Sequence, residues 1–323
     1  MNFKHYFLVG GAGFIGSHFA DALLKLEEVQ KVTIYDNFSS GRKWHYQHHL
    51  DNPKFSVIED DVKNFSALKD AMIHHDVVMH FASNPDISLA STEPSVDFTN
   101  GVYLTQNVVE AARLTQVKRI LYMSGSGIYG DTGTQAVKEN HGPLTPISTY
   151  GASKLFGEAI ISSYCHMFDL SACIFRFGNV VGPRQTHGVG YDFVKKLTNN
   201  PAYLHILGDG TQSKSYIHIE DVINAVLLAH KNLTTPYEVY NVATGDYLTV
   251  REIANLTAAH IAKIPVNFEF SGGDRGWKGD VPIVRLNTDK ISSLGWACQR
   301  NSAQAMKDSI IAINHHIQEG LID

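Results

Sequence analysis

Short apolar runs alternate with longer stretches of helical spacing through the first half of the chain. The apolar runs predict strands at residues 6–9, 32–35, 55–58, 77–81, 119–124 and 172–177. Helical spacing is clearest at residues 14–26, 95–115 and 150–168. Strands and helices that alternate in this way form a parallel sheet covered on both faces, with right-handed crossovers. The pattern therefore predicts a doubly wound α/β Rossmann sheet, with ligand groups at the carboxyl ends of its strands.

Beyond residue 177 the pattern is less regular. It predicts a short helix at 193–197, a strand and a helix between 215 and 230, a strand at 239–243, and short helices after 245. We expect residues 1–177, with returns at about 215–243, to form the sheet domain. Residues 178–214 and 244–323 are expected to form a smaller substrate-binding lobe.

The composition limits the possible partners. The chain has 323 residues and a formal net charge of −5, which argues against binding to nucleic acid or to an anionic membrane. Its three cysteines, Cys165, Cys173 and Cys298, lack metal-ligand spacing and indicate reduced thiols in a cytoplasmic protein. The first residues enter a strand directly, so we expect no signal peptide, and no apolar run is long enough for a membrane span.

Histidine is frequent, with 17 residues, and two groups lie close together in the sequence: His45, His48 and His49, and then His74 and His75. A metal site would need carboxylates or thiols that converge on such histidines. We therefore predict ordinary loop and helix histidines and no metal site.

A glycine-rich turn follows the first predicted strand. Residues 8–16 read Leu-Val-Gly-Gly-Ala-Gly-Phe-Ile-Gly, and Gly10, Gly13 and Gly16 have the spacing of a dinucleotide-binding turn. The second predicted strand ends at Asp36, about 20 residues further on, where a carboxylate can bind ribose hydroxyls. Because this carboxylate repels a 2′-phosphate, the pair of signals predicts NAD rather than NADP. The alternative is a plain turn with an incidental aspartate.

Tyr150 and Lys154 open the predicted helix at 150–168 and are four residues apart. This spacing is about one helical turn, so both side chains lie on one face. A phenol has an ordinary pKa near 10, and a nearby ammonium favours the phenolate and lowers that value. The pair is typical of an acid/base device that takes a proton from a sugar hydroxyl.

Further motifs follow in order along nearly the whole chain: Asp-Asn-Phe-Ser-Ser-Gly (36–41), His-Phe-Ala (80–82), Tyr-Gly (129–130), Arg-Phe-Gly-Asn-Val-Val-Gly-Pro-Arg (176–184), Gly-Asp-Gly-Thr-Gln (208–212) and Asp-Val-Pro (280–282). With these motifs the chain resembles the extended short-chain dehydrogenase/reductase family. Within that family it is similar to the nucleotide-sugar epimerases, in the archaeal branch of the UDP-galactose 4-epimerases.

The resemblance implies a role for each matching residue. Tyr150 is the acid/base, and Lys154 binds the nicotinamide ribose and tunes the tyrosine. The residues that it implies around NAD are Gly10, Gly13, Phe14, Ile15, Gly16, Asp36, Asn37, Ser40, Asp61, Val62, Phe81, Ala82, Ser83, Tyr150, Lys154 and Phe177. Those that it implies around the substrate are Asn179, Lys214, Arg275, Asp280 and Val284. Solvated charge is the alternative for Lys214 and Arg275.

Two positions depart from the family pattern. The family's catalytic Ser or Thr, four residues before Tyr129, is Gly125 here, so we expect Ser124 or Ser126 to supply a hydroxyl, unless both are turn residues. Gly101 stands where the family carries an asparagine that orders the cofactor side of the site.

The main hypothesis is therefore an NAD-dependent 4-epimerase of a UDP-hexose. A nucleotide-sugar 4,6-dehydratase is disfavoured, because Ser126 and Gly127 replace the Asp-Glu pair of those relatives. An NAD(H)-binding regulatory protein without turnover is the alternative from another class. Family members pair as homodimers through helices that correspond to residues 95–115 and 150–168, although apolar residues there could equally be core: Val108, Val109, Ile160 and Ile161.

Overall fold

The computed structural model describes residues 3–84 and 86–322. Residues 1, 2, 85 and 323, which fall within the two expected domains, lie outside this range. The chain divides into two compact units. The first comprises residues 1–125, 149–176 and 225–240, and the second comprises residues 126–148, 177–224 and 241–323. Residues 126–148, expected with the sheet domain, thus group with the second unit.

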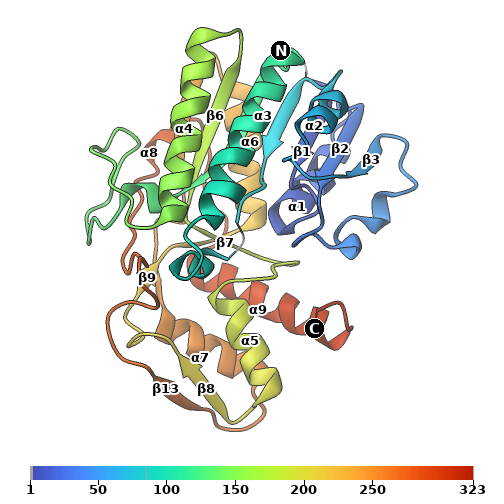
Figure 1. The fold of residues 1–323 in the computed structure, drawn as a ribbon. Helices are drawn as coiled ribbons and strands as arrows, with labels where there is room; N and C mark the ends of the chain where they lie inside the picture. Colours follow the sequence, from blue (N-terminus) through green and yellow to red (C-terminus); the bar gives the residue numbers. More distant parts are fainter. Residues whose placement is uncertain (1–2, 85, 323) are drawn as a thin grey trace. The chain divides into compact units, whose positions relative to one another are not determined.

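The central sheet has seven strands in the order β11-β6-β5-β4-β1-β2-β3 (Figure 1). Strand β1 pairs in parallel with both β2 and β4, and the pairs β2–β3 and β4–β5 are also parallel. The strands are β1 (His5–Val9), β2 (Lys31–Asp36), β3 (Phe55–Glu59), β4 (Val77–His80), β5 (Arg119–Gly125), β6 (Ser171–Phe177) and β11 (Tyr237–Val242). The chain leaves β1 toward one side and returns on the other, so the strand order switches between β1 and β4, where such folds bind ligands. The predicted α/β sheet is confirmed.

Helices α3 and α4 lie side by side against one face of the sheet (Figure 1). The helices of this unit are α1 (Phe14–Leu24), α2 (Phe65–Met72), α3 (Tyr103–Leu114) and α4 (Thr149–Met167), and α6 (Ile219–Asn232) continues into it from the second unit. Phe7 and Val9 point to the same core as Val108, Val109 and Ile161, because alternate strand residues share a face. Apolar residues of the two long helices are therefore core.

The helices differ from the expectations in three details. Helix α2, which was expected only as one of the helical stretches between strands, begins after Asn64, whose side chain caps it by accepting the N–H of Ala67. The helix expected at residues 95–115 spans residues 96–114 and contains a short π-helical segment, Phe98–Val102, before α3. In the C-terminal region α7 and α9 are long rather than short.

The second unit packs helices against small sheets of its own. Its helices are α5 (Val189–Asn199), α7 (Val250–Ile261), α8 (Asp289–Ser292) and α9 (Ser302–Gln318), and its core includes Phe193, Leu204, Ile253 and Ile310. Its two-stranded sheets pair β7 (Asn179–Val181) with β10 (Tyr216–His218), β9 (Ser213–Lys214) with β12 (Leu248–Thr249), and β8 (Tyr203–Ile206) with β13 (Asn267–Phe270). Among the described residues of the whole chain, no helix is both long and apolar enough to cross a membrane.

Candidate active site

The glycine turn between β1 and α1 is too tight for side chains, as Gly10 and Gly16 show. Gly10 has a φ of +77°, and a Cβ there would lie 2.6 Å from the backbone nitrogen of Ala82. A Cβ on Gly16 would lie 2.7 Å from the carbonyl oxygen of Gly10. Helix α1 begins just beyond, at Phe14, with no acidic residue in its first turn. Free N–H groups and the positive end of the helix dipole therefore meet at this turn, which suits a pyrophosphate.

Asp36 ends β2 beside this turn. Its side chain is buried, and its two oxygens accept the N–H of Ala12 at 2.9 Å and of Phe38 at 2.8 Å. Burial raises the pKa of the carboxyl, and these two hydrogen bonds oppose the rise. The carboxylate is thus fixed in direction, and since each oxygen has two lone pairs it can still accept a ribose hydroxyl.

Two more of the expected cofactor residues are in direct contact. Asn37 donates its side-chain N–H to Asp61 at 2.9 Å, and the Tyr35 hydroxyl donates to the carbonyl of Asp61 at 3.2 Å. The carbonyl of Val62 accepts the side-chain N–H of Asn107 at 3.0 Å. The other residues expected around NAD in this unit lie on α1, on the loop after β2, or directly after β4: Ile15, Ser40, Phe81, Ala82 and Ser83.

The first turns of α4 bring Tyr150 and Lys154 together. The buried Lys154 ammonium donates to the carbonyl of Met123 at 2.9 Å and lies 5.5 Å from the centre of the Tyr150 ring. The Tyr150 phenol is hydrogen-bonded to the hydroxyl of Ser83. Ser83 follows Ala82, whose backbone nitrogen would lie 2.6 Å from a Cβ on Gly10. The Tyr150 phenol therefore lies near the glycine turn.

The pKa of Tyr150 differs from the sequence-based expectation. Burial raises it to about 12, and only the hydrogen bond with Ser83 opposes this rise. The net lowering that the sequence analysis expected from Lys154 is therefore not found in this structure. Burial also lowers the pKa of Lys154, to about 8, against an opposing effect of Asp97.

Asp97 holds the start of α4 and was missed by the sequence analysis. Its buried carboxylate accepts the Thr149 hydroxyl at 2.7 Å and the side-chain N–H of Asn84 at 3.0 Å. Its negative charge raises the pKa values of both Tyr150 and Lys154. A lone aspartate 53 residues before Tyr150 carries no sequence signal, because only the fold brings the two near each other.

In the second unit, two expected cations converge on Asp280. Lys214 donates to a carboxylate oxygen of Asp280 at 2.6 Å and lies 5.4 Å from the centre of the Trp277 ring. Arg275 donates to the Asp280 carbonyl at 2.6 Å and to the Asp131 carboxylate at 2.7 Å. Both cations are thus ion-paired, where the sequence left solvated charge as the alternative.

The remaining substrate candidates lie on or next to short strands of this unit. Asn179 is exposed at the start of β7, and its backbone N–H donates to Ser215 at 2.9 Å. Val284 is half-buried, and its N–H donates to the carbonyl of Ser213, next to Lys214, at 3.3 Å. Phe177, which was expected near the cofactor rather than the substrate, is buried at the end of β6.

Comparison with known proteins identifies the family. The pattern described as "NAD dependent epimerase/dehydratase family" matches residues 6–243. This chain belongs to that family, and NAD is the family's cofactor. The glycine turn and Asp36 have the geometry that such a cofactor needs.

Three individual proteins show how far the likeness extends. A Methanocaldococcus jannaschii protein, provisionally named UDP-glucose 4-epimerase, is 31% identical over 93% of this chain and 95% of its own. A solved UDP-galactose 4-epimerase is 36% identical with a TM-score of 0.85, over 98% of this chain and 99% of its own. A Thermus thermophilus UDP-glucose 4-epimerase, solved as a complex with NAD, is 27% identical with a TM-score of 0.84, over 96% and 99% of the two chains.

The first departure from the family pattern leaves open space. A Cβ built on Gly125 would meet no atom within 4 Å. The adjacent Ser124 is buried and donates its hydroxyl to Glu158 at 2.6 Å. Glu158 is also held by Arg176, whose nearest nitrogen lies 2.7 Å away. The Ser124 hydroxyl is therefore part of a buried ion-pair network. Ser126, the other candidate, is half-buried at the start of a short 3-10 helix in the second unit.

The second departure is filled by a neighbour. Gly101 lies in the π-helical segment before α3, and a Cβ there would come within 2.7 Å of the Ser153 hydroxyl and 2.8 Å of the Ser153 Cβ. Ser153 is buried on α4, between Tyr150 and Lys154. Space that a larger residue at position 101 would need is thus occupied by Ser153.

Proposed function

We propose that this protein is an NAD-dependent 4-epimerase of UDP-hexoses. The observation that carries the proposal is the Tyr150 phenol, hydrogen-bonded to Ser83 at the carboxyl end of β4, with buried Lys154 one helical turn further on. These groups belong to the same unit as the glycine turn and Asp36. The proteins named as 4-epimerases of UDP-glucose and UDP-galactose support the same reaction.

Tyr150 is assigned the proton transfer at the sugar's 4-hydroxyl, as general base in one direction and general acid in the other. Bound NAD supplies a reversible hydride acceptor and a positively charged ring that favours the phenolate. Ser83 stabilises the phenolate by hydrogen bonding, since this bond lowers the pKa of Tyr150. Lys154, with its pKa lowered to about 8, remains a hydrogen-bond donor for the cofactor ribose.

The diphosphate of the substrate is assigned to Lys214, Arg275 and Asn179. An ammonium has three donor hydrogens, so Lys214 can serve an anion while it remains bound to Asp280. Asp280 then positions both cations, because its carboxylate accepts a hydrogen bond from Lys214 and its backbone carbonyl accepts one from Arg275.

Val284 is assigned to the pocket for the sugar's C2 substituent. A tyrosine at this position crowds out an N-acetyl group, and valine is smaller, so we expect N-acetylated UDP-hexoses to be accepted at least as readily as plain ones. Comparison of kcat/KM for UDP-GlcNAc and UDP-glucose, before and after Val284→Tyr, tests this. Turnover of UDP-glucose alone by the native protein, or unchanged selectivity in the variant, contradicts it.

NMR of a UDP-sugar panel incubated with the purified protein tests the reaction itself. The expected product differs from its substrate only at C4, whereas a 4,6-dehydratase forms a 4-keto-6-deoxy sugar. Tyr150→Phe should lower kcat about 100-fold or more, with the bound NAD content unchanged. The matched control is Tyr164→Phe on the same helix, where the hydroxyl donates to Glu110 at 3.0 Å. Near-normal turnover in Tyr150→Phe removes Tyr150 from the mechanism, and no turnover of any UDP-sugar favours a regulatory NAD-binding protein.

The homodimer implied by the resemblance stays a proposal, with α3 and α4 as the paired helices. Exposed apolar side chains on or next to these helices are available for such contact: Phe98, Tyr103, Leu114 and Met167. Light scattering of the full chain measures the state directly. The cytoplasmic location expected from the three cysteines, which are all free, also stays a prediction.

A further inference from the structure

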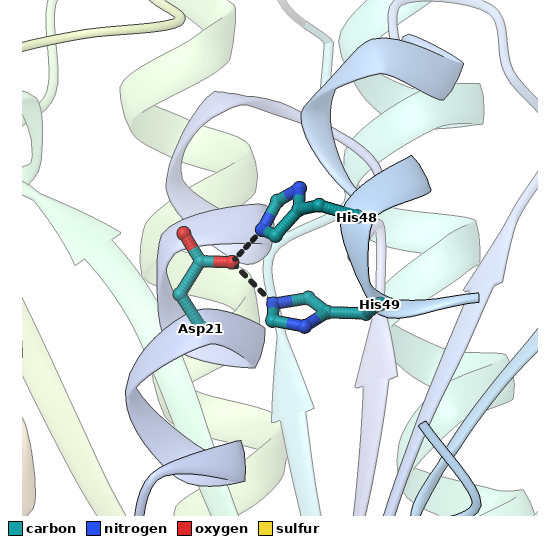
Figure 2. Close-up of side chains that lie close together, drawn as sticks. All are labelled: Asp21, His48 and His49. Carbon is teal, nitrogen blue, oxygen red and sulfur yellow. Dashed lines mark hydrogen bonds and ion pairs between the residues drawn. The ribbon is translucent and has the colours of Figure 1, made fainter. Parts of the chain in front are cut away.

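Asp21, His48 and His49 of the first unit converge on one point (Figure 2). Asp21 lies on α1, and both histidines come from the 3-10 turn Gln47–His49. The Nε2 atoms of His48 and His49 lie 3.0 and 2.6 Å from the same oxygen, Oδ1 of Asp21. The three ligand atoms all lie within 4.8 Å of one another.

Folding supplies the carboxylate that the sequence did not show. Asp21 is 27 residues before His48, so nothing in the local pattern joins them. His45, the third histidine of the sequence cluster, is not part of the group. It is buried, and its Nδ1 lies 2.8 Å from the carbonyl oxygen of Ala12.

The burial of the three side chains suits a bound ion. Asp21 and His49 are largely covered, with 19% and 16% of their side chains exposed, while His48 is 46% exposed and leaves a path to solvent. The His49 ring packs against the rings of Phe55 and His48, with distances of 5.5 and 4.0 Å between ring centres. These contacts hold the imidazoles in their converging orientation, which reduces the entropy that a ligand would have to remove.

Two imidazole nitrogens and one carboxylate oxygen are a donor set for zinc and its neighbours in the first transition row. Zinc lies about 2.0–2.2 Å from such atoms, so ligand atoms in a tetrahedral site are roughly 3.3 Å apart. The present separations of 3.0 and 2.6 Å from the carboxylate oxygen require an opening of less than about 1 Å. Small side-chain rotations on the surface suffice for this.

We propose that Asp21, His48 and His49 form a binding site for a divalent transition-metal ion, with zinc as the favoured ion and water in the remaining position. The ion joins the turn at residues 47–49 to helix α1. The ion thereby links the segment that follows Asp36 to α1, the helix that follows the glycine turn. The site is independent of the proposed epimerase reaction.

Zinc binding to the full chain, stripped with EDTA and dialysed, tests the proposal. Titration with zinc chloride against a chromophoric chelator should show one site per chain that Asp21→Asn and His49→Gln each weaken at least tenfold. Asp21→Asn is the sharper variant, because its amide oxygen still accepts hydrogen bonds from both histidines but carries no charge. The matched control is His166→Gln, because His166 is an exposed histidine elsewhere on the surface. This variant should bind zinc as the native chain does.

Thermal unfolding gives a second readout. Zinc at about a hundredfold excess over its Kd should raise Tm by several degrees in the native chain and in His166→Gln, but not in Asp21→Asn. Magnesium should not raise it, because imidazole nitrogen is a poor ligand for that ion. The proposal is overturned if the native chain binds no zinc, if the double variant His48→Gln/His49→Gln binds it equally well, or if magnesium stabilises as much as zinc.

Discussion

Removal of the Ser83 hydroxyl should slow turnover, because a hydrogen bond from this hydroxyl lowers the pKa of the Tyr150 phenol. The sequence directs attention elsewhere, to Ser124 and Ser126 beside the family's usual position at Gly125. In the structure Ser124 donates instead to Glu158 at 2.6 Å. We therefore expect the Ser83 hydroxyl to supply the catalytic hydrogen bond that Gly125, which has no hydroxyl, cannot supply.

The size of the effect follows from the state of the phenol. A hydrogen bond to a charged group contributes about 1.5–3 kcal/mol, so its loss from the phenolate lowers kcat about 10- to 150-fold. The sign follows from the pKa. The bond from Ser83 lowers the pKa of Tyr150 against the effect of burial, so Ser83→Ala raises it further. The phenolate fraction at neutral pH then falls about tenfold for each unit of that rise.

The assay is the pH dependence of kcat for UDP-sugar epimerisation, with Ser83→Ala compared with Ser124→Ala. Ser83→Ala should lower kcat and move the pH profile to higher pH, while Ser124→Ala should mainly lower Tm. Gly125→Ser in the Ser83→Ala background provides a rescue, because a Cβ at position 125 meets no atom within 4 Å. Partial recovery of kcat there shows that a hydroxyl, rather than a particular residue, is required.

A kcat in Ser83→Ala within about twofold of the native value, together with a loss of tenfold or more in Ser126→Ala, refutes this reasoning and assigns the hydroxyl to Ser126. An unchanged pH profile with a reduced kcat also contradicts it. In that case Ser83 affects packing or cofactor position and not the ionisation of Tyr150.

Three further predictions concern the rest of this unit. NAD should bind at least tenfold more tightly than NADP in calorimetry, because the buried Asp36 carboxylate repels a 2′-phosphate, and tighter NADP binding contradicts this. Glu158→Gln should lower the unfolding free energy by about 1.5–3 kcal/mol, measured by denaturant, because a neutral amide replaces the carboxylate that is hydrogen-bonded to the buried Arg176 guanidinium. Gly101→Ala should cost about 1–3 kcal/mol in the same measurement, and Ser153→Gly should relieve most of that cost.

The first half of the fold was predictable because its signals are local. Apolar runs, the three-glycine turn and the helix after it fix β1, α1 and β2 within about two residues of the observed ends. The long helices α7 and α9 were also within reach, since each begins with a capping box, at Thr249 and Glu252 and at Asn301 and Gln304. An apolar period interrupted by short polar stretches obscured their length.

What the sequence could not supply depends on residues that only the fold brings together. Strands as short as β9, with two residues, exist because they pair with distant segments. Asp97 is hydrogen-bonded to Thr149, which lies 52 residues further along the sequence, and Asp21 is hydrogen-bonded to His49, which lies 28 residues further along. The pKa of Tyr150 is of the same kind, because burial by the surrounding fold outweighs the lysine one turn away.

The two glycines that break the family pattern have opposite physical meanings. At Gly101 the missing side chain is compensated, because Ser153 fills the space and any Cβ would collide with it. Packing against Ser153 therefore accounts for the glycine at position 101, which need not indicate lost activity. At Gly125 the space stays open, so packing does not require glycine there. A protein without catalytic activity would not need a second hydroxyl group hydrogen-bonded to the Tyr150 phenol. The bond from Ser83 therefore favours a relocated catalytic hydroxyl over a protein that binds NAD without turnover.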